Sequence, residues 1–120
     1  MSAAAPFSTN DVPVSEGSRA VSPVHHAMGA SAAEHVAATL KALADPLRLR
    51  MLSLIASSPS GEACVGDIAT VAEVSQPTVS HHLKVLKSVG VLTSQRRATW
   101  IFYSIAPQAR RAVTTLLEAF

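Results

Sequence analysis

Several residue types are rare in this chain of 120 residues. Cys64 is its only cysteine, so one chain can form neither an internal disulfide nor a four-cysteine zinc site. Aromatic residues make up 4% of the sequence, which predicts an aliphatic core built mainly by packed helices. No apolar run approaches the ~18 to 20 residues that span a bilayer, and the first residues lack the pattern of a secretory signal. We therefore expect a cytoplasmic protein without a membrane partner.

Acidic residues are missing from one long stretch of the chain. Between Glu73 and Glu118 there is no Asp or Glu, although the net charge of the whole chain is only +2. Positive charge is therefore concentrated in the second half of the sequence. Such a distribution is typical of a surface that faces a polyanion. The cations of this stretch are Lys84, Lys87, Arg96, Arg97, Arg110 and Arg111.

Residues 1–30 differ in composition from the rest of the chain. They contain three prolines and two glycines among many serines and alanines, with no sustained apolar period. This composition predicts a flexible N-terminal arm. Residues 31–120 then form one domain, which is long enough to bury a modest core.

Helical periodicity dominates the first part of this domain. Apolar residues recur at helical spacing in residues 31–44 and 46–56, which predicts two helices joined at Asp45-Pro46. A third, short helix fits residues 65–71. A fourth covers residues 75–90, with a serine at its N-cap and a glycine at its end.

After the fourth helix the apolar period shortens to about 2, as in a strand. Val91–Arg96 and Trp100–Ile105 are rich in β-forming residues and predict a hairpin, and a last helix follows Pro107. The order of elements is α-α-α-α-β-β-α. This order predicts a winged helix-turn-helix, a mainly α domain in which the β-hairpin is the wing.

The fourth helix combines an apolar face with a polar face that suits DNA. Short polar side chains can reach base edges in the major groove, and cations can contact phosphates. Two adjacent arginines in the wing suit a backbone phosphate or the minor groove. We therefore predict that double-stranded DNA is bound by Ser75, Gln76, Thr78, Ser80, His81, Lys84, Lys87, Arg96 and Arg97. Taken alone, the arginine pair also fits a solvated basic turn, but a helix-turn-helix inside an acid-free stretch favours DNA.

Two segments resemble a known family. Residues 40–52, LKALADPLRLRML, resemble the opening motif of the ArsR/SmtB transcriptional regulators. Residues 75–86, SQPTVSHHLKVL, are similar to the recognition-helix signature of that family. The resemblance extends over residues 31–120. It implies a homodimer built on the first and last helices, binding to operator DNA, and repression that an inducer, often a metal ion, releases.

The last helix gives the implied homodimer independent support, because its apolar stripe is wider than a small domain needs. Two recognition helices related by a two-fold axis would read half-sites about one DNA turn, or a multiple of it, apart. The predicted dimer interface consists of Val36, Leu40, Val113, Leu116, Leu117 and Phe120.

The metal sites that the resemblance implies are incomplete in this sequence. Arsenic, cadmium and lead sensors of the family carry Cys-x-Cys, but here Cys64 is followed by Gly66 at the second position. The last helix contains no histidine, so the interhelical site of the zinc sensors is missing too. The remaining candidates are His25, His26 and His35, whose neutral imidazoles suit Ni(II), Zn(II) and Co(II) better than arsenic. We predict that the arm folds onto the first helix to bring these imidazoles together around a divalent metal ion.

Other interpretations remain open at this stage. The three histidines can be solvated side chains, and Cys64 a small buried one. The chain can then be a regulator without its own metal site, controlled by a co-regulator protein or by the redox state of Cys64, and it can activate rather than repress. A pure protein-interaction module would show no salt-sensitive DNA binding. An enzyme is not expected, because the sequence has no recognisable nucleophile arrangement, phosphate loop or carboxylate pair.

Overall fold

The computed structural model describes residues 26–120. These residues belong to two units, with the boundary between Ala33 and Glu34. In the described part of the first unit, a turn leads into helix α2 (Ala30–Leu43), and the carbonyl of Gly29 accepts a hydrogen bond from the Ala33 amide. Most of the predicted arm, including His25, lies outside the described residues.

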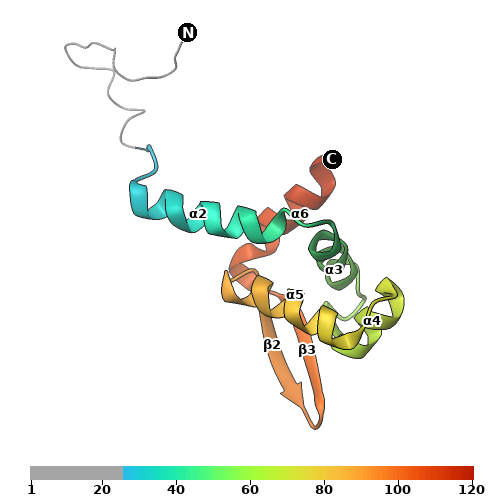
Figure 1. Ribbon diagram of the computed structural model, residues 1–120. Helices are drawn as coiled ribbons and strands as arrows, with labels where there is room; N and C mark the ends of the chain where they lie inside the picture. The colour runs from blue at the N-terminus through green and yellow to red at the C-terminus, as the bar shows by residue number, and fades with distance from the viewer. Residues whose placement is uncertain (1–25) are drawn as a thin grey trace, which may run out of the picture. The chain divides into compact units, whose positions relative to one another are not determined.

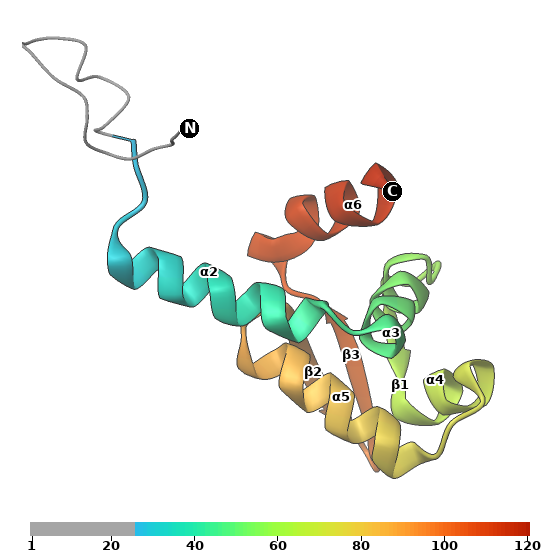
Figure 2. The same cartoon turned by 45° about the horizontal axis from the view of Figure 1, so that its top comes forward.

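The second unit has the predicted order of helices and hairpin (Figure 1). The prediction of a mainly α, winged helix-turn-helix domain is therefore confirmed. Figures 1 and 2 show the hairpin running beside α5. After α2, the elements are α3 (Pro46–Ala56), β1 (Glu62–Cys64), α4 (Val65–Ala72), α5 (Gln76–Ser88), β2 (Leu92–Arg97), β3 (Trp100–Ile105), a 3-10 turn (Pro107–Ala109) and α6 (Arg110–Ala119).

Strand β1 was not predicted. The sheet has three antiparallel strands in the order β1-β3-β2, and the central residue Ala63 of β1 pairs with Tyr103 of β3. Three residues are too few to show a period of two in the sequence. The strand forms because the free edge of β3 offers backbone donors and acceptors to a segment almost 40 residues earlier in the chain.

The core of the second unit is aliphatic, as the scarcity of aromatic residues predicts. Helix α3 contributes Met51, Leu52 and Ile55, all without solvent exposure. They pack with the buried faces of α4 and α5, the base of the hairpin and Val113 of α6. Tyr103 is the one aromatic residue among the buried side chains of the described residues.

Local capping explains where the two central helices begin. The carboxylate of Asp45 accepts a hydrogen bond from the Arg48 amide at 3.0 Å, and Pro46 occupies the first position of α3. Ser75 caps α5 in the same way, because its hydroxyl accepts from the Thr78 amide at 3.3 Å. These caps fix the start of α3 and the direction in which α5 leaves the turn.

Candidate nucleic-acid interface

The turn between α4 and α5 orients the second helix of the motif. Glu73 ends α4 with a left-handed backbone, at a φ of 60°, and the Val74 amide donates to the Ala69 carbonyl at 3.2 Å. Helix α5 then buries Val79, Leu83 and Leu86 against the core. Because these residues share one face, the opposite face of α5 is left for a ligand.

The exposed face of α5 carries the polar side chains that the sequence predicts to bind DNA. Ser75, Gln76, Thr78, His81, Lys84 and Lys87 are exposed, and Ser80 is half-buried. The Ser75 and Thr78 hydroxyls are hydrogen-bonded to each other at 2.9 Å. The ammonium of Lys87 donates to the Ser94 hydroxyl at 2.6 Å, which connects the end of α5 to β2.

His82 points away from this face, although it follows His81 directly. The Arg48 Nε donates to His82 Nδ1 at 2.9 Å, and the same guanidinium donates to the Ala42 carbonyl at 3.1 Å. Arg48 thus connects α5 to the end of α2. His82 therefore belongs to the packing between α5 and α3.

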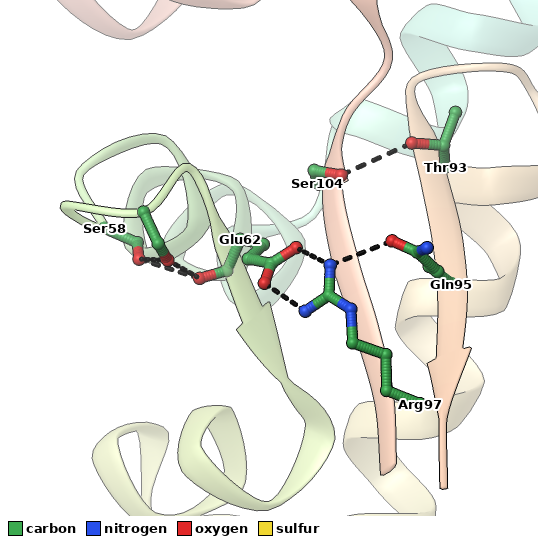
Figure 3. Close-up of polar contacts among 7 residues, drawn as sticks. Ser58, Glu62, Thr93, Gln95, Arg97 and Ser104 are labelled. Carbon is green, nitrogen blue, oxygen red and sulfur yellow. Dashed lines mark hydrogen bonds and ion pairs between the residues drawn. The ribbon is translucent and has the colours of Figure 1, made fainter.

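The two wing arginines have different surroundings. Arg96 is exposed, and no hydrogen bond joins its side chain to another described residue. The guanidinium of Arg97 forms an ion pair with the carboxylate of Glu62, through both of its terminal nitrogens (Figure 3). This hydrogen bonding lowers the pKa of Glu62 and raises that of Arg97. The predicted role of Arg97 in DNA binding is untested, but its guanidinium already has a partner inside the protein.

One exposed aromatic residue beside this face was not predicted from the sequence. Trp100 begins β3 and is 57% exposed. Trp100 lines a pocket of about 450 Å³ together with Gln76 and Ser80 of α5 and Gly66 of α4. The sequence does contain a signal for this residue, because a tryptophan follows the two arginines at the tip of the hairpin. An aromatic side chain at the outer end of a strand does not contribute to the core and therefore indicates a surface role.

The structure describes two of the three predicted metal ligands, His26 and His35. No group of three or more His, Cys, Asp or Glu side chains in residues 26–120 could hold a metal ion. His26 and His35 are each exposed, His26 in the first unit and His35 in the second. Cys64 is 7% exposed, as expected for a small buried side chain. The metal site at His25, His26 and His35 stays a prediction, because His25 lies outside the described residues.

The predicted dimer residues fall into two groups. Val36, Leu40 and Phe120 are exposed, and Leu116 and Leu117 are half-buried. Val113 is 3% exposed and belongs to the core, so its side chain serves the packing of its own protomer. An apolar groove of about 390 Å³ is lined by Leu40, Leu43, Ala44, Leu49, Leu116, Leu117 and Phe120.

Known proteins share both the sequence and the fold of this chain. The profile of the family described as "Bacterial regulatory protein, arsR family" matches residues 45–94. An HTH-type transcriptional regulator of Methanocaldococcus jannaschii is 36% identical over 85 residues, which are 71% of this chain and 93% of that protein. The chain belongs to the ArsR family of transcriptional regulators. It is therefore a DNA-binding regulator and not an enzyme.

Further relatives and solved structures are similar to this chain. The arsenical resistance operon repressor of Escherichia coli is 39% identical over 67 residues, 56% of each chain. A homodimeric winged helix-turn-helix DNA-binding domain from Mycobacterium bovis is 34% identical, with a TM-score of 0.66 over 75% of this chain and 81% of that domain. NolR from Sinorhizobium fredii is 29% identical, with a TM-score of 0.62 over 85% and 95% of the two chains.

None of the helices within residues 26–120 combines the length and the apolar character needed to cross a bilayer.

Proposed function

We propose that this ArsR-family chain reads operator DNA as a homodimer, with α5 in the major groove and the β2–β3 wing on the adjacent backbone or minor groove. The observation that supports this proposal is the division of α5 into a buried apolar face and an exposed polar face. An α-helix of this kind fits the width of the major groove of B-DNA. Each chain has one recognition helix, and a two-fold axis would supply a second recognition helix from the partner copy.

The proposed contacts differ along α5. Gln76 and Thr78 lie in its first turn, where side chains of a recognition helix contact base edges. Lys84 and Lys87 lie further along and are assigned to phosphates, as is Arg96 in the wing. The remaining proposed contacts are Ser75, Ser80 and His81.

The homodimer is supported by the exposure of α2. Of its fourteen residues only Ala42 is buried, and a helix of this length is marginal in water without tertiary packing. The apolar groove beside Leu40 lies between this helix, α3 and α6, and it ends at the fully exposed Phe120. A second copy of the chain would cover both surfaces, as in the homodimeric domain of the Mycobacterium bovis relative.

Fluorescence anisotropy with duplex DNA from the region upstream of the gene tests the proposal. Affinity should fall by about 10³-fold or more between 50 and 200 mM salt if several phosphates are neutralised. Gln76→Ala should change the preferred sequence, whereas Lys84→Gln should weaken binding to all sequences alike. Binding that ignores salt would instead favour the protein-interaction module.

For the effector, we propose a divalent metal ion, Ni(II), Zn(II) or Co(II), held by His25, His26 and His35. The proposal is supported by the preference of imidazoles for these ions and by the exposure of His26 and His35. Calorimetry with nickel and with zinc should show binding heat for the wild type and none for a variant lacking the three histidines. Equal binding heats for the wild type and the variant would contradict the proposal. Control by a co-regulator protein would then be the alternative, and the regulator could either repress or activate. A redox response of Cys64 would require this buried thiol to become accessible.

A further inference from the structure

The two wing arginines point to opposite faces of the sheet, because they are consecutive residues of β2. Arg96 shares its face with Ser94, whose hydroxyl accepts a hydrogen bond from Lys87 of α5. Arg97 shares the other face with Gln95. Arg96 therefore lies on the side of the hairpin that carries the hydrogen bond between Ser94 and Lys87 of α5.

The guanidinium of Arg97 makes three hydrogen bonds on its own face of the sheet. Its two terminal nitrogens donate to the two oxygens of Glu62, with Nη2 and Oε1 2.8 Å apart. Nη2 also donates to the Gln95 side-chain oxygen at 2.8 Å, and the guanidinium carbon lies 4.6 Å from the centre of the Phe102 ring. Two parallel donors on one carboxylate are the geometry in which arginine binds such groups best.

The backbone of Glu62, whose carboxylate receives Arg97, is held in place by the chain around it. The Glu62 carbonyl accepts hydrogen bonds from the Ser58 hydroxyl at 2.7 Å and the Ser60 hydroxyl at 3.2 Å (Figure 3). On the strand side, Glu62 is paired with Ser104 of β3. The short strand β1 leads directly into α4, the first helix of the helix-turn-helix. The ion pair thus connects the outer end of the wing to the segment that begins the DNA-reading motif.

We propose that Arg97 is a positioning residue, which Glu62 holds so that the wing keeps a fixed direction relative to α4 and α5 while Arg96 contacts DNA. A phosphate would have to displace a bidentate carboxylate from Arg97, and the negative charge of Glu62 opposes a phosphate on that face. This inference rests on the proposed DNA-binding mode of the wing. The sequence predicts that both arginines bind DNA, whereas this inference assigns DNA contact to Arg96 and positioning of the wing to Arg97.

The test combines three arginine variants with the single tryptophan as a probe. Trp100 pairs with Arg97 across the hairpin and is the only tryptophan of the chain, so its fluorescence anisotropy reports the order of the wing. In the DNA-free protein, Arg97→Gln and Glu62→Ala should lower this anisotropy by the same amount, and their combination should lower it no further. Arg96→Gln, the matched control, should leave it unchanged. Circular dichroism verifies that each variant is folded.

The salt dependence of DNA affinity separates positioning from phosphate contact. Arg96→Gln should reduce the slope of log affinity against log salt by about 1. Arg97→Gln and Glu62→Ala should leave the slope unchanged and weaken binding by about two- to fivefold. Arg97→Lys keeps the charge but not the bidentate geometry, so it should behave like Arg97→Gln.

The opposite results would overturn the inference. If Arg97 contacts phosphate, Glu62→Ala tightens binding, Arg97→Gln reduces the slope as Arg96→Gln does, and Arg97→Lys behaves like the wild type. If the wild type itself fails to bind duplex DNA, the proposed function is wrong. The Trp100 anisotropy of the DNA-free variants still decides whether Glu62 and Arg97 order the wing.

Discussion

The Arg48 side chain connects the recognition helix to two other helices. It belongs to α3, donates to His82 of α5 and donates to the carbonyl of Ala42 near the end of α2. A part-buried side chain of this kind satisfies acceptors that water does not easily reach. Its role is therefore to hold α5 in place.

Replacing Arg48 should destabilise the fold more than replacing its neighbour. Arg48→Met leaves His82 Nδ1 and the Ala42 carbonyl without their donor, and we expect a loss of about 1–3 kcal/mol in the free energy of unfolding. Arg50→Met is the control, because Arg50 is exposed and should change stability by less than about 0.5 kcal/mol. Urea unfolding followed by circular dichroism measures both. Equal effects would contradict the bridging role of Arg48.

The capping carboxylate of Asp45 makes stability depend on acid pH. The hydrogen bond from the Arg48 amide lowers its pKa below the ordinary value of 3.8, so the folded state favours the ionised form. This contribution is present above pH 3.8 and is lost as the pH falls through the folded-state pKa. The stability advantage of the wild type over Asp45→Asn should therefore shrink between pH 5 and pH 3 in urea unfolding. An advantage that grows on acidification would contradict this assignment.

At the scale of elements, the wing contains a local conflict between sequence and backbone. Its two-residue loop places Ala98 at a φ of 55°, a left-handed conformation that favours glycine. A glycine at this position relieves the strain of the left-handed backbone, but it also loses more conformational entropy on folding than alanine does. We expect the relief of strain to be the larger of the two contributions, so Ala98→Gly should stabilise the domain by about 0.5–1 kcal/mol. Thr99→Gly, at the neighbouring position without positive φ, should destabilise it. Thermal unfolding of the two variants compares them, and the opposite order would show that the loop has another conformation in solution.

Sequence periodicity predicted the helices and the hairpin because each of them is defined by contacts close in the chain. The start of α3 at Asp45-Pro46 and the start of α5 at Ser75 follow from capping residues that are visible in the sequence. Strand β1 and the ion pair of Glu62 with Arg97 could not be predicted in this way. Both depend on pairing between segments about 35 to 42 residues apart, which no local pattern encodes. As a consequence, the stretch that lacks acidic residues in the sequence has the carboxylate of Glu62 beside it in the folded protein.

At the scale of the whole molecule, the exposed apolar surface of α2 and α6 should hold two copies together. Leu40 is 57% exposed and lines the apolar groove, so Leu40→Glu should convert a dimer into a monomer without unfolding the protomer core. Val71→Glu is the matched control, because Val71 is equally exposed but lies on α4 outside the groove. Light scattering after gel filtration gives the mass of each variant. A dimeric Leu40→Glu protein would show that the interface lies elsewhere.

A footprint on the DNA upstream of the gene tests the account most directly, because it examines the reading helix and the two-fold symmetry together. Hydroxyl-radical cleavage in the presence of the wild-type chain should reveal two protected segments whose centres are about 10–10.5 base pairs, or a multiple of that distance, apart. The Gln76→Ala variant should lose or shift both segments together. A single protected segment, or none at low salt, would contradict a dimer that places two α5 helices in the major groove.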